Sequence, residues 1–500
     1  MTFNPVENRL LDLGQRYAEF QSDPQKRLLI WQAKENAMRF YQCFFEVQKH
    51  ETPLSAGGFF ILFDTSFANS IDYSRNLKAS LLGQYEASAD ILAGQGIAAD
   101  WIYRPENLPD SAFGFAQSLL SFGSKHRAHI DYLVAVLMPT QVEDDLAFAS
   151  WIEQLLNLTL PERLRLIVID PLSSPRLTTL AASGDSRIQV DEPPIDGLIA
   201  AQETFAQEKT NGPAGVFRNL LAGLMALAER GSFDEVMLKA ADALEFVRKH
   251  QWTEQEFVVR MLVAGALLRE NRLVEAINHY QHARKTAKKA ADAGSKAGQE
   301  LEIQALMGEA AAHLAGQDLL GAAECYDDAA QTAESIPNLI LGIESYRMGC
   351  FSRHRLNESE NALQRGRNAL LLGGRLDPAV RGLTTLPLAG IDVLRVIDSS
   401  RIDRMQSIKF ERDTAIGKAR QECERQVLAL GQTPTPDAFR QLEAALSCSS
   451  QDADAKALNA FRLCVARASP EFKDLMNCLD ELLGQGWMMN ALIALPPSDT

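Results

Sequence analysis

The chain has 500 residues, enough for about three domains of ordinary size and for a large core without disulfides or metals. Hydrophobic residues make up 46% and charged residues 23% of the sequence, a balance that excludes a largely disordered protein. Fifty Lys and Arg against 65 Asp and Glu give a net charge of -15, which repels phosphate backbones and anionic lipid, so we expect no nucleic-acid partner.

The amino-terminal residues contain no basic start followed by an apolar stretch, and no run of about 18 apolar residues occurs anywhere. The sequence therefore predicts neither a secretory signal nor a transmembrane segment. The seven cysteines are scattered and never form a C-x-x-C pair, a pattern that favours reduced thiols. These features together predict a cytoplasmic protein.

Two kinds of pattern occupy the first 210 residues. Residues 5–50 have apolar positions at helical spacing and predict two helices, within a segment 1–56 that packs on the next domain. From Gly57 onward, short apolar runs alternate with amphipathic stretches. The expected strands are 59–63, 101–103, 133–138, 166–169 and 188–190, and the expected helices lie near 70–93, 110–126, 143–158 and 175–183. Residues 57–210 thus predict an α/β domain with a doubly wound, mostly parallel sheet, covered on both faces.

Strand patterns stop after the polar segment 207–213, and the remaining chain predicts helices with an internal repeat. A small residue is followed by an aromatic residue four positions later and by an alanine three positions after that. The members are Ala276, Tyr280 and Ala283, and then, 46 residues later, Ala322, Tyr326 and Ala329. Weaker copies begin 40 residues to either side, at Val236 and Ala362.

This spacing resembles the second helix of a tetratricopeptide repeat over residues 214–375. The small and bulky residues of the family's first helix are matched by Ala264 with Leu267 and by Ala310 with His313. The family's opening tryptophan is absent, and the repeats exceed the usual length of about 34 residues. The resemblance implies an all-α, TPR-like helical-hairpin solenoid with a helical C-terminal cap over 376–500. The alternative is an unrelated helical bundle.

The order of elements in residues 57–197 is similar to the core of a P-loop NTPase, but its motifs are missing. A phosphate loop needs G-x-x-x-x-G-K-[ST] after the first strand, because glycine N–H groups and the lysine hold the phosphates. Here Asp64 follows that strand, and no glycine stands between Gly58 and Gly83. Pro139 occupies the place of a magnesium carboxylate. We expect a degenerate domain that does not bind ATP, GTP or any other cofactor.

Two carboxylates are the candidates for catalysis. Asp64 and Asp170 each follow a predicted strand, at the edge where open parallel sheets bind ligands. Such a pair could hold magnesium or act as acid and base. Each residue also suits a turn or a helix cap. No nucleophile elbow or activated cysteine accompanies them, so the sequence favours a protein that is not an enzyme.

Histidines occur twice at a spacing of three, as His126 with His129 and as His279 with His282. Both pairs lack further ligands at the spacing of a known zinc site, so no metal is expected. The basic run 284–289 suits the solvated end of a helix, although it could also suggest nucleic acid. No aromatic residues are interleaved with it to stack on bases.

In a helical-hairpin solenoid the first helices line a concave groove that binds a peptide or a partner's helix. The expected lining residues are Arg218, Met261, Gln304, Met307, Glu344, Arg347, Phe351 and His354. The leading hypothesis is a non-enzymatic cytoplasmic scaffold or adaptor for a protein partner. Its resemblance to solenoid chaperones and adaptors of bacterial secretion systems makes cargo handling one version. The alternatives are a signalling ATPase-like or ligand-sensing regulator, and an enzyme that uses Asp64 and Asp170.

Overall fold

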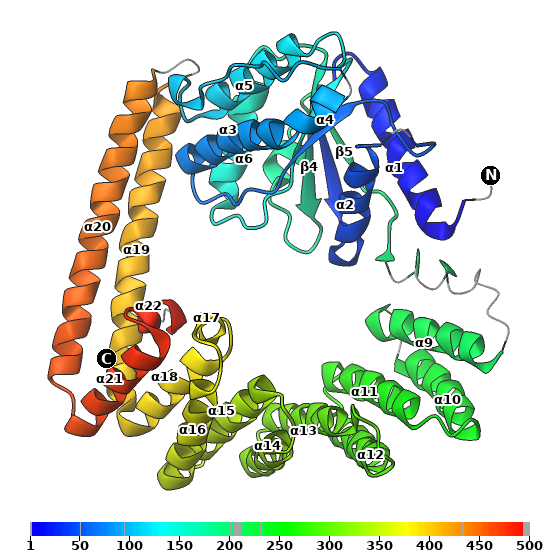
Figure 1. The fold of residues 1–500 in the computed structure, drawn as a ribbon, viewed down its shortest axis with the longest axis vertical. Coiled ribbons are helices and arrows are strands. Elements are labelled where there is room, and N and C mark those ends of the chain that lie inside the picture. The colour runs from blue at the N-terminus through cyan, green and yellow to red at the C-terminus, as the bar shows by residue number, and fades with distance from the viewer. Residues whose placement is uncertain are drawn as a thin grey trace. The chain divides into compact units, whose positions relative to one another are not determined.

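The chain folds into two compact units in a computed structural model (Figure 1). The structure describes residues 3–493 except 51, 95, 198, 201–202, 205–211, 231–232 and 432–434, so most of the polar segment 207–213 lies outside it. The first unit comprises Met1–Gln207 and Ile416–Gln451, and the second comprises Glu208–Ala415 and Asp452–Thr500. No helix within the described ranges is long and apolar enough to cross a membrane.

The first unit contains a parallel sheet of five strands. They are β1 (Leu28–Ala33), β2 (Phe59–Phe63), β3 (Leu133–Leu137), β4 (Leu164–Pro171) and β5 (Ile188–Asp191). The strand order is β2-β3-β4-β1-β5, and every neighbouring pair is parallel. Every side chain of β3 is buried, as expected for a strand covered on both faces. The predicted doubly wound α/β fold is confirmed.

Helices cover both faces of this sheet. They are α1 (Pro5–Ser22), α2 (Met38–Val47), α3 (Ser70–Ala87), α4 (Ala89–Gly94), α5 (Ala112–Lys125), α6 (Asp145–Leu156) and α7 (Thr178–Ala181), with one-turn helices at Glu35–Ala37 and Pro105–Asn107. Side chains alternate along β4 between two apolar clusters: Leu166 joins the cluster that includes residues of α3, α5 and α6, whereas Ile167 joins that of α1 and α2. The sheet therefore has a separate core on each face.

Two predicted elements of this unit are wrong. Residues 28–33 form strand β1, between β4 and β5, instead of beginning a second helix. A central parallel strand is apolar on both faces, so its short apolar run cannot be distinguished from a helix by periodicity. Residues 101–103 form no strand. The Trp101 ring stacks on Tyr103 at 4.7 Å and meets Tyr85 of α3 edge-on, so this run is apolar because of side-chain packing.

The second unit is a succession of helices in which neighbours along the chain contact each other. The first eight are α9 (Pro213–Arg230), α10 (Phe233–Lys249), α11 (Thr253–Arg269), α12 (Leu273–Asp292), α13 (Gly298–Ala315), α14 (Leu319–Glu334), α15 (Leu339–Arg355) and α16 (Ser359–Gly374). Asn271, Gln317 and Asn357 occupy the same place after α11, α13 and α15, with φ of 56°, 60° and 61°. Each of these turns ends its helix in the left-handed conformation that is common at helix C-termini.

The small residues of the repeat lie where the sequence pattern places them, between helices. Ala276, Ala322 and Ala329 are completely buried. Tyr280 lies against Gly308 of α13 so closely that a Cβ there would come within 2.4 Å of its ring. Small side chains therefore let the helices approach, and the tyrosine fills the space between one helix pair and the next. The expected array of paired helices is confirmed.

The last part of the chain divides between the units, although the sequence predicts one cap over 376–500. The elements are α17 (Pro378–Arg381), α18 (Leu386–Ile397), α19 (Ser399–Ala429), α20 (Pro436–Ala466), α21 (Pro470–Leu483) and α22 (Trp487–Ala491). Helix α18 packs on α16, where a Cβ on Gly366 would lie 2.2 Å from Val393 Cγ2. Residues 416–451 instead belong to the first unit, where Phe439 shares an apolar cluster with Ile71 of α3.

Candidate functional site

The candidate site is the surface of the first helices of the helix pairs. In Figure 1 the helices α9 to α16 follow one another in a curved row, with the odd-numbered helices on its inner side. The eight residues expected to line a groove all lie on these helices. Arg218 is on α9, Met261 on α11, Gln304 and Met307 on α13, and Glu344, Arg347, Phe351 and His354 on α15.

Five of the eight expected residues occupy equivalent positions, since α11, α13 and α15 follow the sequence offsets of 46 and 40 residues. One equivalent set is Met261, Met307 and Arg347, and the next is Val258, Gln304 and Glu344. Both methionines and Arg347 are half-buried, Gln304 is exposed, and Val258 is 38% exposed. One backbone framework therefore presents apolar side chains on α11 and a charged pair on α15.

The charged pair on α15 is part of a three-residue cluster. Arg347 donates to the Glu344 carboxylate at 2.7 and 2.9 Å, and its Nη1 lies 3.4 Å from Asp392 Oδ2 of α18. The Arg347 side chain is only 16% exposed. Burial raises the pKa of Asp392 to about 6, with Arg347 acting in the opposite direction. Arg347 is therefore held by two carboxylates and is not a free surface charge.

The other two expected residues of α15, Phe351 and His354, lie near further cations. The guanidinium of Arg355 lies 5.8 Å from the centre of the Phe351 ring, close enough for a cation–π contact. His354 is half-buried, and its Nδ1 has no hydrogen-bond partner. Burial, together with the nearby charge of Arg395, lowers the pKa of His354. Lowering the pKa favours the neutral form of this imidazole.

The sequence interpretation missed exposed apolar residues on the second helices. Val274 and Leu320 are the second residues of α12 and α14, and they are 74% and 51% exposed. They are 46 residues apart, so they occupy equivalent positions of the repeat. An apolar residue two places before the small residue, in both copies, is the signal that could have identified them.

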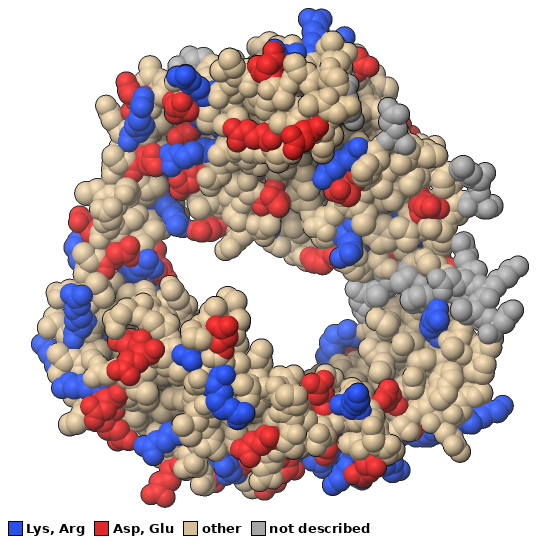
Figure 2. All heavy atoms as spheres, viewed as in Figure 1, with Lys and Arg blue, Asp and Glu red and all other residues tan. Residues whose placement is uncertain are grey.

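The basic run 284–289 is partly engaged in ion pairs. Arg284 Nη1 lies 3.7 Å from Glu309 Oε2 and 3.6 Å from Asp328 Oδ2, whereas Lys285 and Lys288 are exposed beside it. Figure 2 shows Lys and Arg interspersed with Asp and Glu over the visible surface of this unit. The run therefore lies in a surface of mixed charge.

The structure does not bring the two carboxylates of the sheet unit together. Asp64 follows β2 and is exposed, whereas Asp170 lies in β4, and β3 separates the two strands. With strands about 4.8 Å apart, the two positions are about 10 Å apart across the sheet. Asp170 is buried and accepts hydrogen bonds from the backbone N–H groups of Arg176 and Leu177 at 2.8 and 3.3 Å. Its geometry is that of a turn cap.

The paired histidines also separate into different surroundings. His126 ends α5 and is buried among aromatic rings, 4.9 Å from the ring of Phe122, whereas His129 is exposed. His279 is half-buried on α12, and the ring Nδ1 of exposed His282 contacts the carbonyl of Asn278 at 2.7 Å. Neither pair belongs to a group of three or more side chains of metal-binding type in the described part of the chain.

No protein-family model matches this chain, and no curated protein matches it in sequence. A function therefore has to be inferred from the side chains and their geometry.

Proposed function

We propose that this chain is a non-enzymatic cytoplasmic scaffold or adaptor that binds a protein partner along the first helices of its tetratricopeptide-like helix pairs. The observation that carries the proposal is the equivalence of the lining positions: Met261 and Met307 on one framework, and Arg347 at the same position of the next pair. Solenoid proteins recognise extended peptides and helices in this way, by varying side chains on a repeated backbone.

The chemistry of the surface indicates the kind of partner. Half-buried methionines on α11 and α13 offer adaptable apolar contacts, because an unbranched thioether adjusts to different shapes. Glu344 and Arg347 on α15 add polar groups that are already oriented by their own ion pair. An amphipathic helix or extended segment with apolar and charged side chains fits this sequence of contacts. Cargo handling in a bacterial secretion system is one version of the proposal.

The experiment recovers partners from the native organism with the full-length chain and with variants that leave the helix pairs folded. Val258→Asp and Gln304→Arg change exposed positions of α11 and α13. Reversing Glu344 and Arg347 would also place an acidic side chain against Asp392, so it tests folding as well as binding. The matched control is Lys289→Glu, an exposed residue of α12.

We expect one specific partner to be lost or weakened about tenfold with the α11 and α13 variants and retained with the control. Loss of a rim contact acts mainly on the association rate, which surface plasmon resonance measures. If wild type and both variants recover the same partner with equal affinity, the contact lies elsewhere and the proposal is wrong.

A ligand-sensing regulator is the second candidate, because the first unit contains a largely apolar cavity of about 430 Å³. Phe59, Tyr85, Phe122 and His126 are among its lining residues. Phe59 begins β2, so this cavity lies at the amino end of the strands, opposite the edge where parallel sheets usually bind nucleotides. An ATPase-like regulator and an enzyme using Asp64 and Asp170 have less support, since β3 separates those carboxylates.

Ligand-dependent melting separates the two candidates. A ligand present at 100 times its dissociation constant stabilises the folded state by about 2.7 kcal/mol. For the scaffold, magnesium nucleotides and small apolar compounds should leave the melting temperature unchanged. A reproducible increase with one of the small apolar compounds, or with magnesium ATP or GTP, together with heat of binding in calorimetry, would favour the regulator instead.

A further inference from the structure

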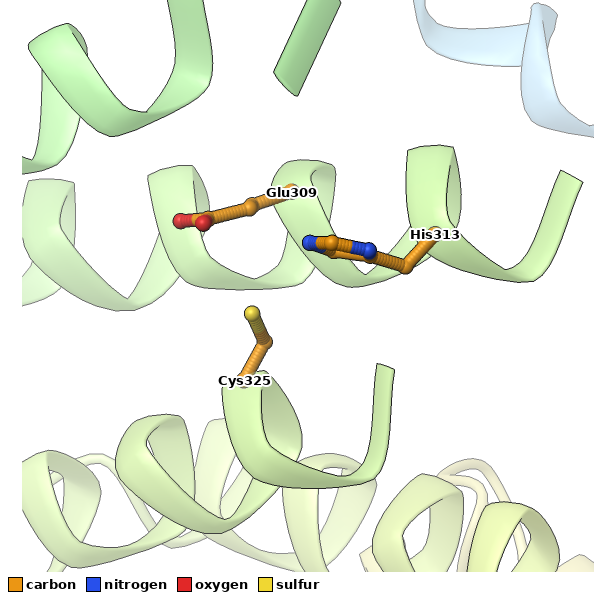
Figure 3. Close-up of side chains that lie close together, drawn as sticks. All are labelled: Glu309, His313 and Cys325. Atoms are coloured by element: carbon orange, nitrogen blue, oxygen red, sulfur yellow. The ribbon is translucent and has the colours of Figure 1, made fainter. Parts of the chain in front are cut away.

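Three side chains of metal-binding type meet inside the helix pair α13/α14. Glu309 and His313 are four residues apart on α13, and Cys325 lies on α14. One ligand atom from each lies within 4.8 Å of the other two, and this is the one such group found in the described residues. Figure 3 shows the Cys325 sulfur pointing from its helix toward the space between the carboxylate and the imidazole.

Glu309 carries a buried oxygen that its neighbours leave without a hydrogen bond. Its side chain is 3% exposed, and Gln281 Nε2 donates to Oε1 at 2.9 Å, but Oε2 has no hydrogen-bond partner. Arg284 Nη1 is 3.7 Å from Oε2, beyond hydrogen-bond distance. The Arg284 ion pair offsets part of the carboxylate's charge, but a buried oxygen without a hydrogen bond remains costly.

His313 is oriented as a metal ligand would be. Its Nδ1 lies 2.8 Å from Asp318 Oδ2, so this carboxylate accepts the Nδ1 proton and leaves Nε2 with a free lone pair. Metal-binding histidines commonly have a carboxylate behind the ring in this arrangement. Gly321 makes room for the pair, because a Cβ there would lie 2.6 Å from both Asp318 Oδ2 and His313 Nδ1.

We propose that Glu309, His313 and Cys325 bind one zinc-type divalent metal ion that joins α13 to α14. Carboxylate, imidazole and thiolate are the ligand types of zinc, and three of them leave one position for water. Ligand atoms around tetrahedral zinc are about 3.5 Å apart, so closing the site from 4.8 Å requires only side-chain adjustment. On binding, the thiol proton of Cys325 leaves to solvent and its sulfur bonds to the metal.

The neighbouring charges are compatible with this site. Arg284 is the basic residue that forms an ion pair with Glu309. It also pairs with Asp328 at 3.6 Å, so it retains a carboxylate partner if Glu309 binds the metal. Burial, aided by Glu309, raises the pKa of the Cys325 thiol to about 12. Without a bound metal ion, this raised pKa favours the protonated thiol over the thiolate.

The equivalent positions of the adjacent helix pairs contain different chemistry. Subtracting the repeat offset of 46 from 309, 313 and 325 leads to Val263, Leu267 and His279; adding 40 leads to Gly349, Arg353 and Arg365. In that second set Arg353 and Arg365 both form ion pairs with Asp327. The equivalent positions are thus mainly apolar in α11/α12, whereas in α15/α16 they carry arginines held in a salt-bridge network. The ligand set is a property of α13/α14 and not of the repeat.

The test is zinc binding by the full-length chain after treatment with a chelator. We expect calorimetry with zinc chloride to give one ion per chain, and cobalt chloride to produce the absorption band of a thiolate–cobalt bond. Cys325→Ser and His313→Gln should each weaken zinc binding at least tenfold, and Cys325→Ser should abolish the cobalt–thiolate band. The matched control is Cys350→Ser, a completely buried cysteine of α15 outside the cluster.

Asp318→Asn keeps the test valid if those variants fold poorly, because this side chain is 54% exposed and asparagine keeps an oxygen that can cap α14 at the Gly321 N–H while removing the charge behind His313. Loss of such an outer carboxylate typically weakens metal binding about 10- to 100-fold. Absence of stoichiometric zinc binding in the wild type would overturn the proposal. Equal zinc affinity in wild type, Cys325→Ser and Asp318→Asn would overturn it as well.

Discussion

Single residues decide how closely the helices of the second unit approach. Ala264, Ala310 and Ala322 are completely buried at the contacts between helices. A larger side chain at these positions would have to displace its neighbours, because protein interiors contain few voids larger than a water molecule. The small residues of the repeat are therefore needed because larger side chains would not fit between the helices.

Replacing Ala322 by Leu should lower the free energy of unfolding by about 1 to 3 kcal/mol, because the added atoms overpack the α13/α14 contact. Urea denaturation of the purified chain measures this change. Ala315→Leu is the control, since Ala315 is exposed at the end of α13 and the same exchange there should change stability by less than about 0.5 kcal/mol. An unchanged denaturation midpoint for Ala322→Leu would contradict the helix-pair contact.

The buried carboxyl of Asp392 should make stability depend on pH. Its pKa is raised by burial to about 6 in the folded chain, so the folded state binds the proton more tightly than the unfolded state. The resulting stabilisation is present at low pH and is lost as the pH rises through about 6. A shift of about two units corresponds to at most about 3 kcal/mol.

Asp392→Asn should therefore flatten the decline in stability between pH 4 and pH 7, as measured by thermal melting across that range. Asp403→Asn serves as control, because Asp403 is 58% exposed and pairs with Arg395 at the surface. A variant Asp392→Asn that keeps the wild-type pH profile would show that this carboxyl does not titrate abnormally.

At the scale of elements, a tight turn sets the geometry of each helix pair. Gln317 has a positive φ of 60° after α13, and the Asp318 N–H donates to the His313 carbonyl at 2.9 Å across the turn. A non-glycine residue in this conformation carries a steric cost that glycine avoids.

Gln317→Gly should stabilise the chain by about 0.5 to 1 kcal/mol, because the left-handed conformation no longer strains a side chain. The same exchange at Gln304, in the middle of α13 and exposed, should destabilise it by about 1 kcal/mol. Denaturant titration of the two variants provides a comparison with opposite expected signs. Equal signs would show that the turn conformation does not control the stability of the pair.

At the scale of the whole molecule, residues 416–451 join the first unit although they are more than 200 residues beyond its sheet. Glu424 accepts hydrogen bonds from the backbone N–H and the hydroxyl of Ser70, both at 2.6 Å, at the first turn of α3. Ile71 forms an apolar cluster with Cys423, Val427 and Phe439. A carboxylate at a helix N-terminus and a small apolar cluster together hold this segment on α3.

Ile71→Ala should weaken the packing of residues 416–451 on α3 by about 2 to 5 kcal/mol, because removal of the buried side chain leaves a cavity. Hydrogen exchange should then become faster in residues 416–451, whereas amides of α11 to α16 stay protected. Ile91→Ala is the control, since Ile91 is 64% exposed on α4. Unchanged exchange in 416–451 would mean that the cluster does not hold the segment.

The sequence alone determined the features that depend on local periodicity. Alternating apolar runs and helical stretches predict the α/β unit, and the spacing from Ala276 to Ala322 predicts the helix pairs. These patterns are readable because each element must bury one face with its own repeat distance.

Only the tertiary structure decided which distant segments meet. Strand β1 is recognisable from its pairing with β4 and β5, and residues 416–451 join the first unit through contacts with α3. The burial of Arg347 depends on Asp392, 45 positions away, and the Glu309, His313 and Cys325 group depends on how α13 turns back to α14. Periodicity describes one element at a time, whereas strand partners, buried ion pairs and converging ligands are set by packing between elements.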